Sequence, residues 1–143
     1  MTAYLGLGTN LGSDKTANLH QAVSLINEQA GQVLACSSFI ESEPWGFCSE
    51  NTFLNAVVAI DTPYTPNELL RVTQSIERSM GRTHKSVDGC YTDRVIDIDI
   101  LLYDNLVVDE AELTIPHPLI WQRPFVYVPL LEIAPHVAHP ETL

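Results

Sequence analysis

The stretch Arg94-Val95-Ile96-Asp97-Ile98-Asp99-Ile100-Leu101-Leu102-Tyr103 decides how the rest of this chain is interpreted. Its β-branched and apolar residues predict a strand, in which successive side chains point to opposite faces. The alternation predicts one face made of Ile96, Ile98, Ile100 and Leu102, and an opposite face made of Val95, Asp97, Asp99 and Leu101. The two carboxylates then project to the same side, roughly 7 Å apart along the strand.

Two acids on one face of such an apolar strand allow two interpretations. Carboxylates at this spacing repel each other unless a cation lies between them. Mg²⁺ usually takes one or two carboxylates and completes its shell with water and phosphate oxygens, so the pair is a candidate metal site for a nucleotide. We expect a buried, central strand with both acids in a cleft. The alternative is an edge strand whose Asp face is simply solvated.

Length and composition indicate one globular domain. The chain has 143 residues, of which 45% are hydrophobic and 17% charged, as in ordinary folded domains. No apolar run reaches the roughly 20 residues that span a bilayer, and the N-terminus lacks the basic start of a signal peptide. We therefore expect a cytoplasmic protein without a membrane partner. Its three cysteines lack CxxC spacing and predict free thiols.

The net charge of −11 argues against nucleic acid as a partner. Five of the seven Lys and Arg residues nevertheless gather in the segment that leads to the two aspartates: Arg71, Arg78, Arg82, Lys85 and Arg94. Scarce cations in one segment favour a small polyanionic ligand. Arg71 and Arg78 are also compatible with the solvated side of a helix.

Hydrophobic periodicity predicts a β-α-β-β-α-β order. The expected strands are residues 3–9, 32–41, 53–60 and the Asp97 stretch, and the expected helices are 14–30 and 65–81. With right-handed crossovers this order gives a ferredoxin-like α+β fold: an antiparallel sheet with two helices on one face, here followed by a C-terminal extension of short helices. A short run at 106–108 could pair with the Asp97 strand as a hairpin.

Two further features of this pattern concern ligands. Strand 53–60 is too apolar to be an edge, so Asn55 is either a satisfied core amide or a reader of a ligand. Residues 82–93 have no periodicity, and loops of about a dozen residues are uncommon in compact domains unless they are lids or binding loops. We expect this segment to be a mobile lid.

Six motifs, taken together, resemble the hydroxymethyldihydropterin pyrophosphokinases of folate biosynthesis. They are Gly8-Thr9-Asn10-Leu11-Gly12, Phe53-Leu54-Asn55-Ala56, Gly81-Arg82, the 94–100 run, Pro116-His117-Pro118 and Arg123-Pro124-Phe125. The resemblance implies one domain over residues 1–143 that transfers pyrophosphate from ATP to the hydroxymethyl group of 6-hydroxymethyl-7,8-dihydropterin. The products are AMP and the pterin diphosphate. It further implies two Mg²⁺ ions, ATP as co-substrate and a monomer.

The resemblance also implies which residues act. The metal ligands are Asp97 and Asp99, which with Arg82 and Arg94 form the catalytic set. The ATP-binding residues are Gln74, Glu77, Arg82, Arg94, Ile100, His117 and Arg123. The pterin-binding residues are Ser42, Trp45, Phe53, Asn55, Asp97, Arg123 and Phe125. Phe53 and Phe125 would sandwich the pterin while Asn55 reads its edge. Taken singly, both rings would be core aromatics and His117 a packed histidine.

The chain departs from the family pattern in the 82–93 loop. Tyr91-Thr92-Asp93 stands where the family usually has a tryptophan, one residue and a proline, and His84 stands where it often has arginine. These changes leave open how the loop closes. Two other functions compete: a ferredoxin-like module that binds a ligand without ATP turnover, and a metal-dependent phosphohydrolase that needs no pterin.

Overall fold

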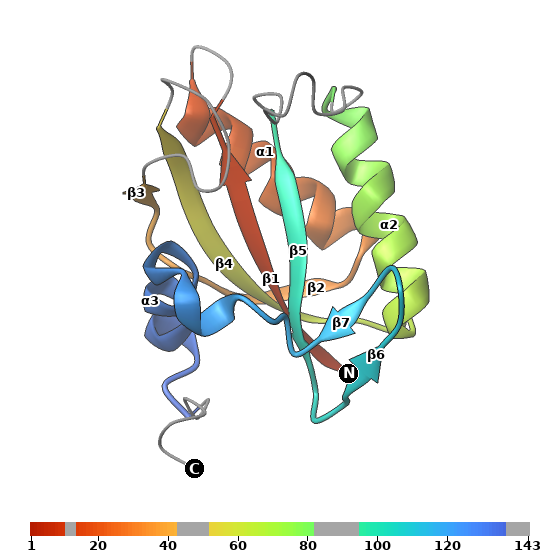
Figure 1. The fold of residues 1–143 in the computed structure, drawn as a ribbon. Coiled ribbons are helices and arrows are strands. Elements are labelled where there is room, and N and C mark those ends of the chain that lie inside the picture. The colour runs from red at the N-terminus through yellow and green to blue at the C-terminus, as the bar shows by residue number, and fades with distance from the viewer. Residues whose placement is uncertain (11–13, 43–51, 82–94, 137–143) are drawn as a thin grey trace.

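The computed structural model describes residues 1–10, 14–42, 52–81 and 95–136. Its elements, in chain order, are β1 (Thr2–Thr9), α1 (Lys15–Gln29), β2 (Gln32–Cys36), β3 (Ile40–Ser42), β4 (Phe53–Asp61), α2 (Pro66–Ser79), β5 (Asp97–Tyr103), β6 (Val108–Asp109), β7 (Thr114–Ile115), a 3₁₀ turn η1 (Ile120–Gln122) and α3 (Pro124–Ile133). The fold is α+β. Its main sheet is antiparallel in the order β2-β4-β1-β5, with β3 also paired to β4 (Figure 1).

Local signals set the bounds of the first two helices, as predicted. Asp14 caps α1 by accepting a hydrogen bond from the Ala17 amide at 3.0 Å. Thr65 and Glu68 form a capping box at the start of α2, where each side chain accepts from the other residue's backbone amide. Gly81 follows the end of α2 with φ +99°, a conformation that glycine adopts without strain.

Two hydrophobic clusters divide the molecule into layers. The larger cluster packs α1 and α2 on one face of the sheet through residues such as Leu19, Ile76 and Ile98. The smaller one packs α3 and η1 on the opposite face, through Val57, Leu101, Ile120, Val126, Leu130 and Ala134 (Figure 1). We call this second surface the α3 face. The expected C-terminal helices therefore exist and cover part of the sheet that the first two helices leave open.

The predicted strand at 32–41 is two strands. Ser37 interrupts it because its hydroxyl oxygen accepts a hydrogen bond from the Val57 amide at 2.8 Å, in place of a backbone carbonyl. The next amide, that of Ser38, donates to the Glu132 carboxylate on α3 instead of to a strand. Both β2 and β3 still pair with β4. The break between β2 and β3 therefore links the sheet to α3 through Ser38 and Glu132, while pairing with β4 continues on both sides of it.

The prediction that the Asp97 strand is central is wrong. In the described sheet β5 pairs with β1 alone and forms one edge. The predicted faces hold from Asp97 to Leu101, where the pairing with β1 shifts register between Tyr4 and Leu5. Val95 precedes β5 and packs with the larger cluster, so its expected place on the face of the acids is wrong. This bulge turns Leu102 toward the α3 cluster, so its expected place beside Ile96, Ile98 and Ile100 is also wrong. Tyr103 packs with the larger cluster instead.

The run at 106–108 does not pair with the Asp97 strand. β6 pairs with β7 in a separate two-stranded sheet. The chain turns sharply after β5 because Asp104 has φ +46° and bonds Thr2 in both directions: its amide donates to the Thr2 carbonyl, and its carboxylate accepts from the Thr2 amide. These contacts draw the turn toward the start of β1 instead of folding it back on β5.

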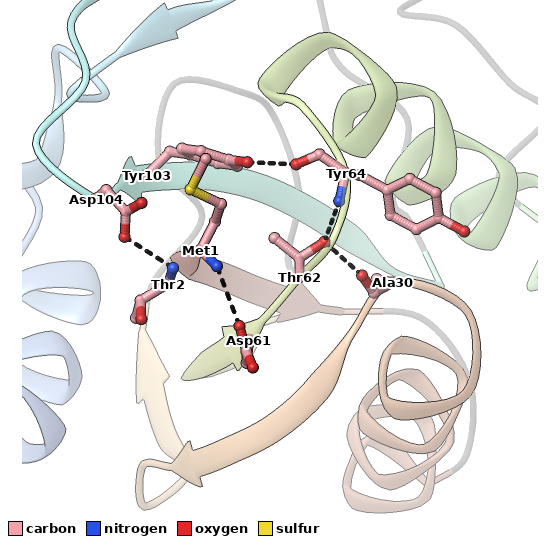
Figure 2. Close-up of polar contacts among 8 residues, drawn as sticks. All are labelled: Met1, Thr2, Ala30, Asp61, Thr62, Tyr64, Tyr103 and Asp104. Carbon is pink, nitrogen blue, oxygen red and sulfur yellow. Dashed lines mark hydrogen bonds and ion pairs between the residues drawn. The ribbon is translucent and has the colours of Figure 1, made fainter.

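Polar contacts close the end of the sheet where β1 begins and where β4 and β5 end. The N-terminal ammonium lies 3.1 Å from Asp61, and the Thr2 amide donates to Asp104 at 2.8 Å (Figure 2). The Thr62 hydroxyl donates to the Ala30 carbonyl at 2.7 Å, and the Tyr103 hydroxyl donates to the Tyr64 carbonyl. We call this the closed end.

Among the helices that the structure describes, none is both long enough and apolar enough to cross a membrane.

Candidate active site

The candidate site lies on the α3 face at the other end of the sheet, where β1 ends and where β4 and β5 begin. Gly8 of β1 is paired with Asn55 of β4 on one side and with Asp97 of β5 on the other. Neighbouring strands are roughly 4.8 Å apart, so Asn55 and Asp97 are separated by roughly 10 Å. The residue between them, Gly8, has no side chain. We call this row the open strip.

The two aspartates project to the same side of β5, as predicted. Asp97 and Asp99 are partly exposed, whereas Ile98 and Ile100 between and beyond them are buried. Leu101, on the same side as the acids, packs against α3. The acids therefore lie on the α3 face and not between the sheet and the first two helices.

The outer edge of β5 is held by a buried carboxylate. Glu77 of α2 is 5% exposed, and its Oε2 accepts a hydrogen bond from the Ile98 amide at 2.8 Å. Ile98 separates the two aspartates, so this bond fixes the backbone that carries both of them. Sequence reasoning missed this role of Glu77, because the contact joins residues 21 positions apart and depends on how α2 packs.

The donor set of this strand suits magnesium. Carboxylate oxygens are the hard ligands that Mg²⁺ prefers, and two of them leave most of its octahedral shell to water and phosphate. Gly8 and Gly6, opposite Asp97 and Asp99, add no side chain on that face. Asp97 and Asp99 therefore fit the ion in both chemistry and access.

Asn55 presents its acceptor to the open strip. Its side-chain nitrogen donates to the Ile40 carbonyl at 3.1 Å and to the Ser42 hydroxyl oxygen at 2.8 Å, so both of its N–H groups are occupied. Its Oδ1 lies 3.3 Å from where a Cβ on Gly8 would be. The amide is 4% exposed. It is thus held by β3 on its donor side and turned toward β1 on its acceptor side.

Both predicted aromatic rings lie on the α3 side of the sheet. Phe53 begins β4, is partly buried, and has its Cδ1 atom 3.4 Å from the Cβ position of Gly8. Phe125 lies in the first turn of α3 and packs against the α3 cluster. The guanidinium carbon of Arg123 is 5.9 Å from the centre of the Phe125 ring, a cation–π distance.

His117 enters the site next to Arg123 and Asp97. Its amide donates to the Leu101 carbonyl of β5 at 2.9 Å, and its Nδ1 accepts from the Leu119 amide at 3.2 Å. The neutral ring therefore carries its proton on Nε2. Burial lowers the pKa of His117, and the nearby Arg123 charge lowers it further, while Asp97 opposes both. At neutral pH this ring is an uncharged N–H donor.

The structure does not bring every predicted residue to this face. Gln74 and Glu77 belong to α2, and the Ile100 side chain is buried under the first two helices, so these three lie on the other side or at the edge of β5. Trp45, Arg82 and Arg94, and the proposed lid at 82–93, lie outside the described residues. The described site consists of Ser42, Phe53, Asn55, Asp97, Asp99, His117, Arg123 and Phe125.

Comparison with known proteins identifies the family. Residues 4–135 match the model of the 7,8-dihydro-6-hydroxymethylpterin-pyrophosphokinase family. The chain belongs to this family. A 2-amino-4-hydroxy-6-hydroxymethyldihydropteridine pyrophosphokinase of Porphyromonas gingivalis is 50% identical over 139 residues, covering 96% of this chain and 93% of that protein. The enzyme of the same name from Methylorubrum extorquens is 47% identical over 134 residues, covering 93% and 82%.

A solved structure supports the same arrangement of elements. A Plasmodium falciparum HPPK-DHPS structure with pteroate superposes with a TM-score of 0.79 over 97% of this chain at 16% identity. The chain spans 42% of that longer protein. At this identity the likeness shows the fold alone.

Proposed function

We propose that the open strip and its neighbours on the α3 face carry out the reaction of the family. The chain transfers pyrophosphate from ATP to the hydroxymethyl group of 6-hydroxymethyl-7,8-dihydropterin, in folate synthesis, which follows from the family membership and from relatives of that name. One observation carries the location: Asn55, Gly8 and Asp97 form one row across three strands. In this row the Asn55 amide and the Asp97 carboxylate lie on either side of Gly8, and we propose that the flat pterin ring binds along it.

The pterin would lie along this row with its ring edge at Asn55. Because the amide nitrogen is occupied by Ile40 and Ser42, Asn55 offers Oδ1, an acceptor suited to a ring N–H or amino group. Phe53 and Phe125 would supply the two faces on which a flat heterocycle stacks. The hydroxymethyl group would then point to the Asp97 end. Trp45 is proposed as a further pterin contact.

Asp97 and Asp99 would hold two Mg²⁺ ions. When bound, these ions neutralise phosphate charge and make the coordinated hydroxyl group more acidic. The contribution of the chain is positional: one strand presents both carboxylates on one face, and the Glu77 bond to the Ile98 amide keeps that strand in place. An acidic protein can bind a polyanion here only if cations outweigh its own charge locally.

The phosphates would lie between the acids and a set of donors. His117 would donate through Nε2, and Arg123 would face both ligands across the Phe125 ring. Arg82 and Arg94 are proposed to complete the clamp. We propose that the nucleotide also contacts three residues near the outer edge of β5: Gln74, Glu77 and Ile100. The first two belong to α2, and Ile100 lies on the side of β5 that faces the first two helices.

With these groups in place, no covalent nucleophile from the protein is required. The pterin hydroxyl oxygen forms a bond to the β phosphorus, and the bond from that phosphorus to the α–β bridging oxygen breaks. The bridging oxygen leaves on AMP, and the hydroxyl proton passes to solvent. The site contributes by holding the attacking and leaving oxygens in line.

Three wider features belong to the same proposal. The order β2-β4-β1-β5, with α1 and α2 packed on one face, supports a ferredoxin-like sheet. The family match over residues 4–135 supports one domain over residues 1–143. We further propose a monomer that works in the cytoplasm. These three remain predictions.

Incubation with ATP, Mg²⁺ and reduced pterin tests the proposal. AMP and pterin diphosphate should appear together in equal amounts, and omission of either Mg²⁺ or pterin should stop both. Stoichiometric ADP would contradict transfer of two phosphates. Orthophosphate release without pterin would identify a phosphohydrolase, and binding without turnover would identify a ligand-binding module.

A further inference from the structure

We infer that Gly8 is a positioning residue for the pterin: its missing side chain lets Asn55 and Phe53 settle against β1 in the geometry that binds the ring. The inference rests on the proposed pterin site and adds a specificity-determining position to it. Gly8 itself makes no side-chain contact with a ligand. Its effect would pass entirely through the two residues of β4.

Backbone conformation does not explain this glycine. Of the described glycines, Gly81 is the one with a positive φ, whereas Gly8 lies inside a regular strand pair on both sides. Glycine in a strand interior weakens the strand, and it often marks a place where another group approaches the backbone closely. The atoms packed beside Gly8 are therefore the reason to consider for a glycine at this position.

Those neighbours are two of the proposed pterin residues. A Cβ on Gly8 would lie 3.3 Å from Oδ1 of Asn55, 3.4 Å from Cδ1 of Phe53 and 3.7 Å from Cε1 of the same ring. The first distance is shorter than nearly all Cβ contacts, so the amide oxygen would have to shift by a few tenths of an ångström. The Phe53 ring borders the same position and could not take up the displaced atom freely.

The Asn55 amide has little freedom to move away. Its nitrogen is held by the Ile40 carbonyl and the Ser42 hydroxyl, so a rotation that withdraws Oδ1 from β1 stretches at least one of these bonds. Buried amides keep such bonds because losing one leaves a polar group without compensation. A methyl group at Gly8 therefore shifts the acceptor or the ring that would meet the pterin.

Gly6 provides a matched control on the same strand and the same face. A Cβ on Gly6 would meet only the Leu101 side chain, with nearest atoms at 3.4, 3.4 and 3.6 Å. These distances are ordinary van der Waals contacts, so a methyl group on Gly6 fits beside Leu101 without displacing it. Gly6→Ala thus measures the effect on stability and activity of adding a methyl group to β1 beside Leu101, and not beside Asn55 or Phe53.

The test compares Gly8→Ala with Gly6→Ala in the full chain. Gly8→Ala should raise the KM for pterin on the order of tenfold, which corresponds to about 1.4 kcal/mol, while the KM for ATP stays near that of the wild type. Gly6 lies opposite Asp99, so the control value is the pterin KM alone, which Gly6→Ala should leave within about twofold. A Gly8→Ala enzyme with wild-type pterin KM would overturn the inference, and so would an equal rise in the KM values for pterin and ATP.

A double-variant cycle keeps the test decisive if Gly8→Ala folds poorly. Phe53→Leu makes room beside residue 8, so Gly8→Ala combined with Phe53→Leu should fold and should raise the pterin KM by less than the product of the two single effects. Full additivity would overturn the inference. Wild-type protein that formed no AMP with ATP and pterin would instead reject the proposed function itself.

Discussion

The two ends of the same sheet use polar residues in opposite ways. At the closed end, side chains such as Thr62 and Tyr103 donate to carbonyls of other segments and so complete contacts within the chain (Figure 2). At the end with the open strip, Asn55 and Asp97 flank Gly8, which has no side chain, and the Asn55 acceptor lies beside it. Three strands thus serve stability at one end and binding at the other.

This difference shows where each kind of mutation should act. Polar groups whose partners lie within the chain contribute to the free energy of unfolding, because their loss leaves a buried partner unsatisfied. At the other end Asp97 and Asp99 are partly exposed, so replacing them should cost less of the free energy of unfolding than replacing a buried group such as Thr62. Variants at the closed end should therefore lower the free energy of unfolding, and variants at the end with the open strip should lower activity.

The largest effect is expected for the two acids of β5. Asp97→Asn or Asp99→Asn should lower kcat by on the order of a thousandfold or more, because a metal clamp stabilises transition-state charge by several kcal/mol. The thermal midpoint should change far less than kcat, since both side chains are partly exposed. Asp109→Asn, an exposed acid on β6, is the matched control. Near-normal turnover at saturating Mg²⁺ in either site variant would remove these residues from the site.

The closed end should show the reverse pattern. Thr62→Val keeps the shape but removes the hydroxyl that donates to the Ala30 carbonyl and accepts from the Tyr64 amide. Because Thr62 is 2% exposed, the free energy of unfolding should fall by about 1–3 kcal/mol. In urea unfolding, Asp61→Asn should cost far less, since its ion pair with the N-terminus is largely exposed. Loss of kcat in Thr62→Val below its melting range would contradict the separation.

A smaller effect is expected from the ring on α3. Phe125→Ala should weaken pterin binding by about 0.5–1.5 kcal/mol beyond the loss of buried area, and ATP binding should change little. Calorimetric titration with each ligand separately measures both. Phe125 also packs against the α3 cluster, so Tyr127→Ala, another partly buried aromatic of α3 in that cluster, is the control for packing. Equal weakening of both ligands would indicate a disturbed fold.

Sequence reasoning succeeded where the signal was local. Hydrophobic periodicity over 14–30 and 65–81 predicted both helices, and the caps that begin them, at Asp14 and Thr65, involve residues within three positions. Alternation within one strand was enough to place Asp97 and Asp99 on one face, and the 53–60 segment does form a strand paired on both sides.

Features that depend on distant partners were not predictable in this way. The break at Ser37 requires the Val57 amide, and the turn of Leu102 requires the register between β1 and β5. The edge position of β5 depends on which strand lies beside it, which the alternation does not encode. The setting of Gly8 likewise requires the register of two neighbours, although an interior glycine is itself a signal of close approach.

The smallest effect concerns His117 and the acid side of the stability profile. Burial and Arg123 hold its pKa below the ordinary 6.5, so the unfolded chain binds a proton more readily than the native one. The contribution of this ring to stability is therefore complete above pH 6.5 and is lost as the pH falls through its lowered native pKa. His117→Gln, which cannot titrate, should flatten the difference between urea unfolding at pH 7.5 and pH 5.5. If His117→Gln gave the same pH dependence as the wild type, the ring would not be the neutral, partly buried donor that we propose for the site.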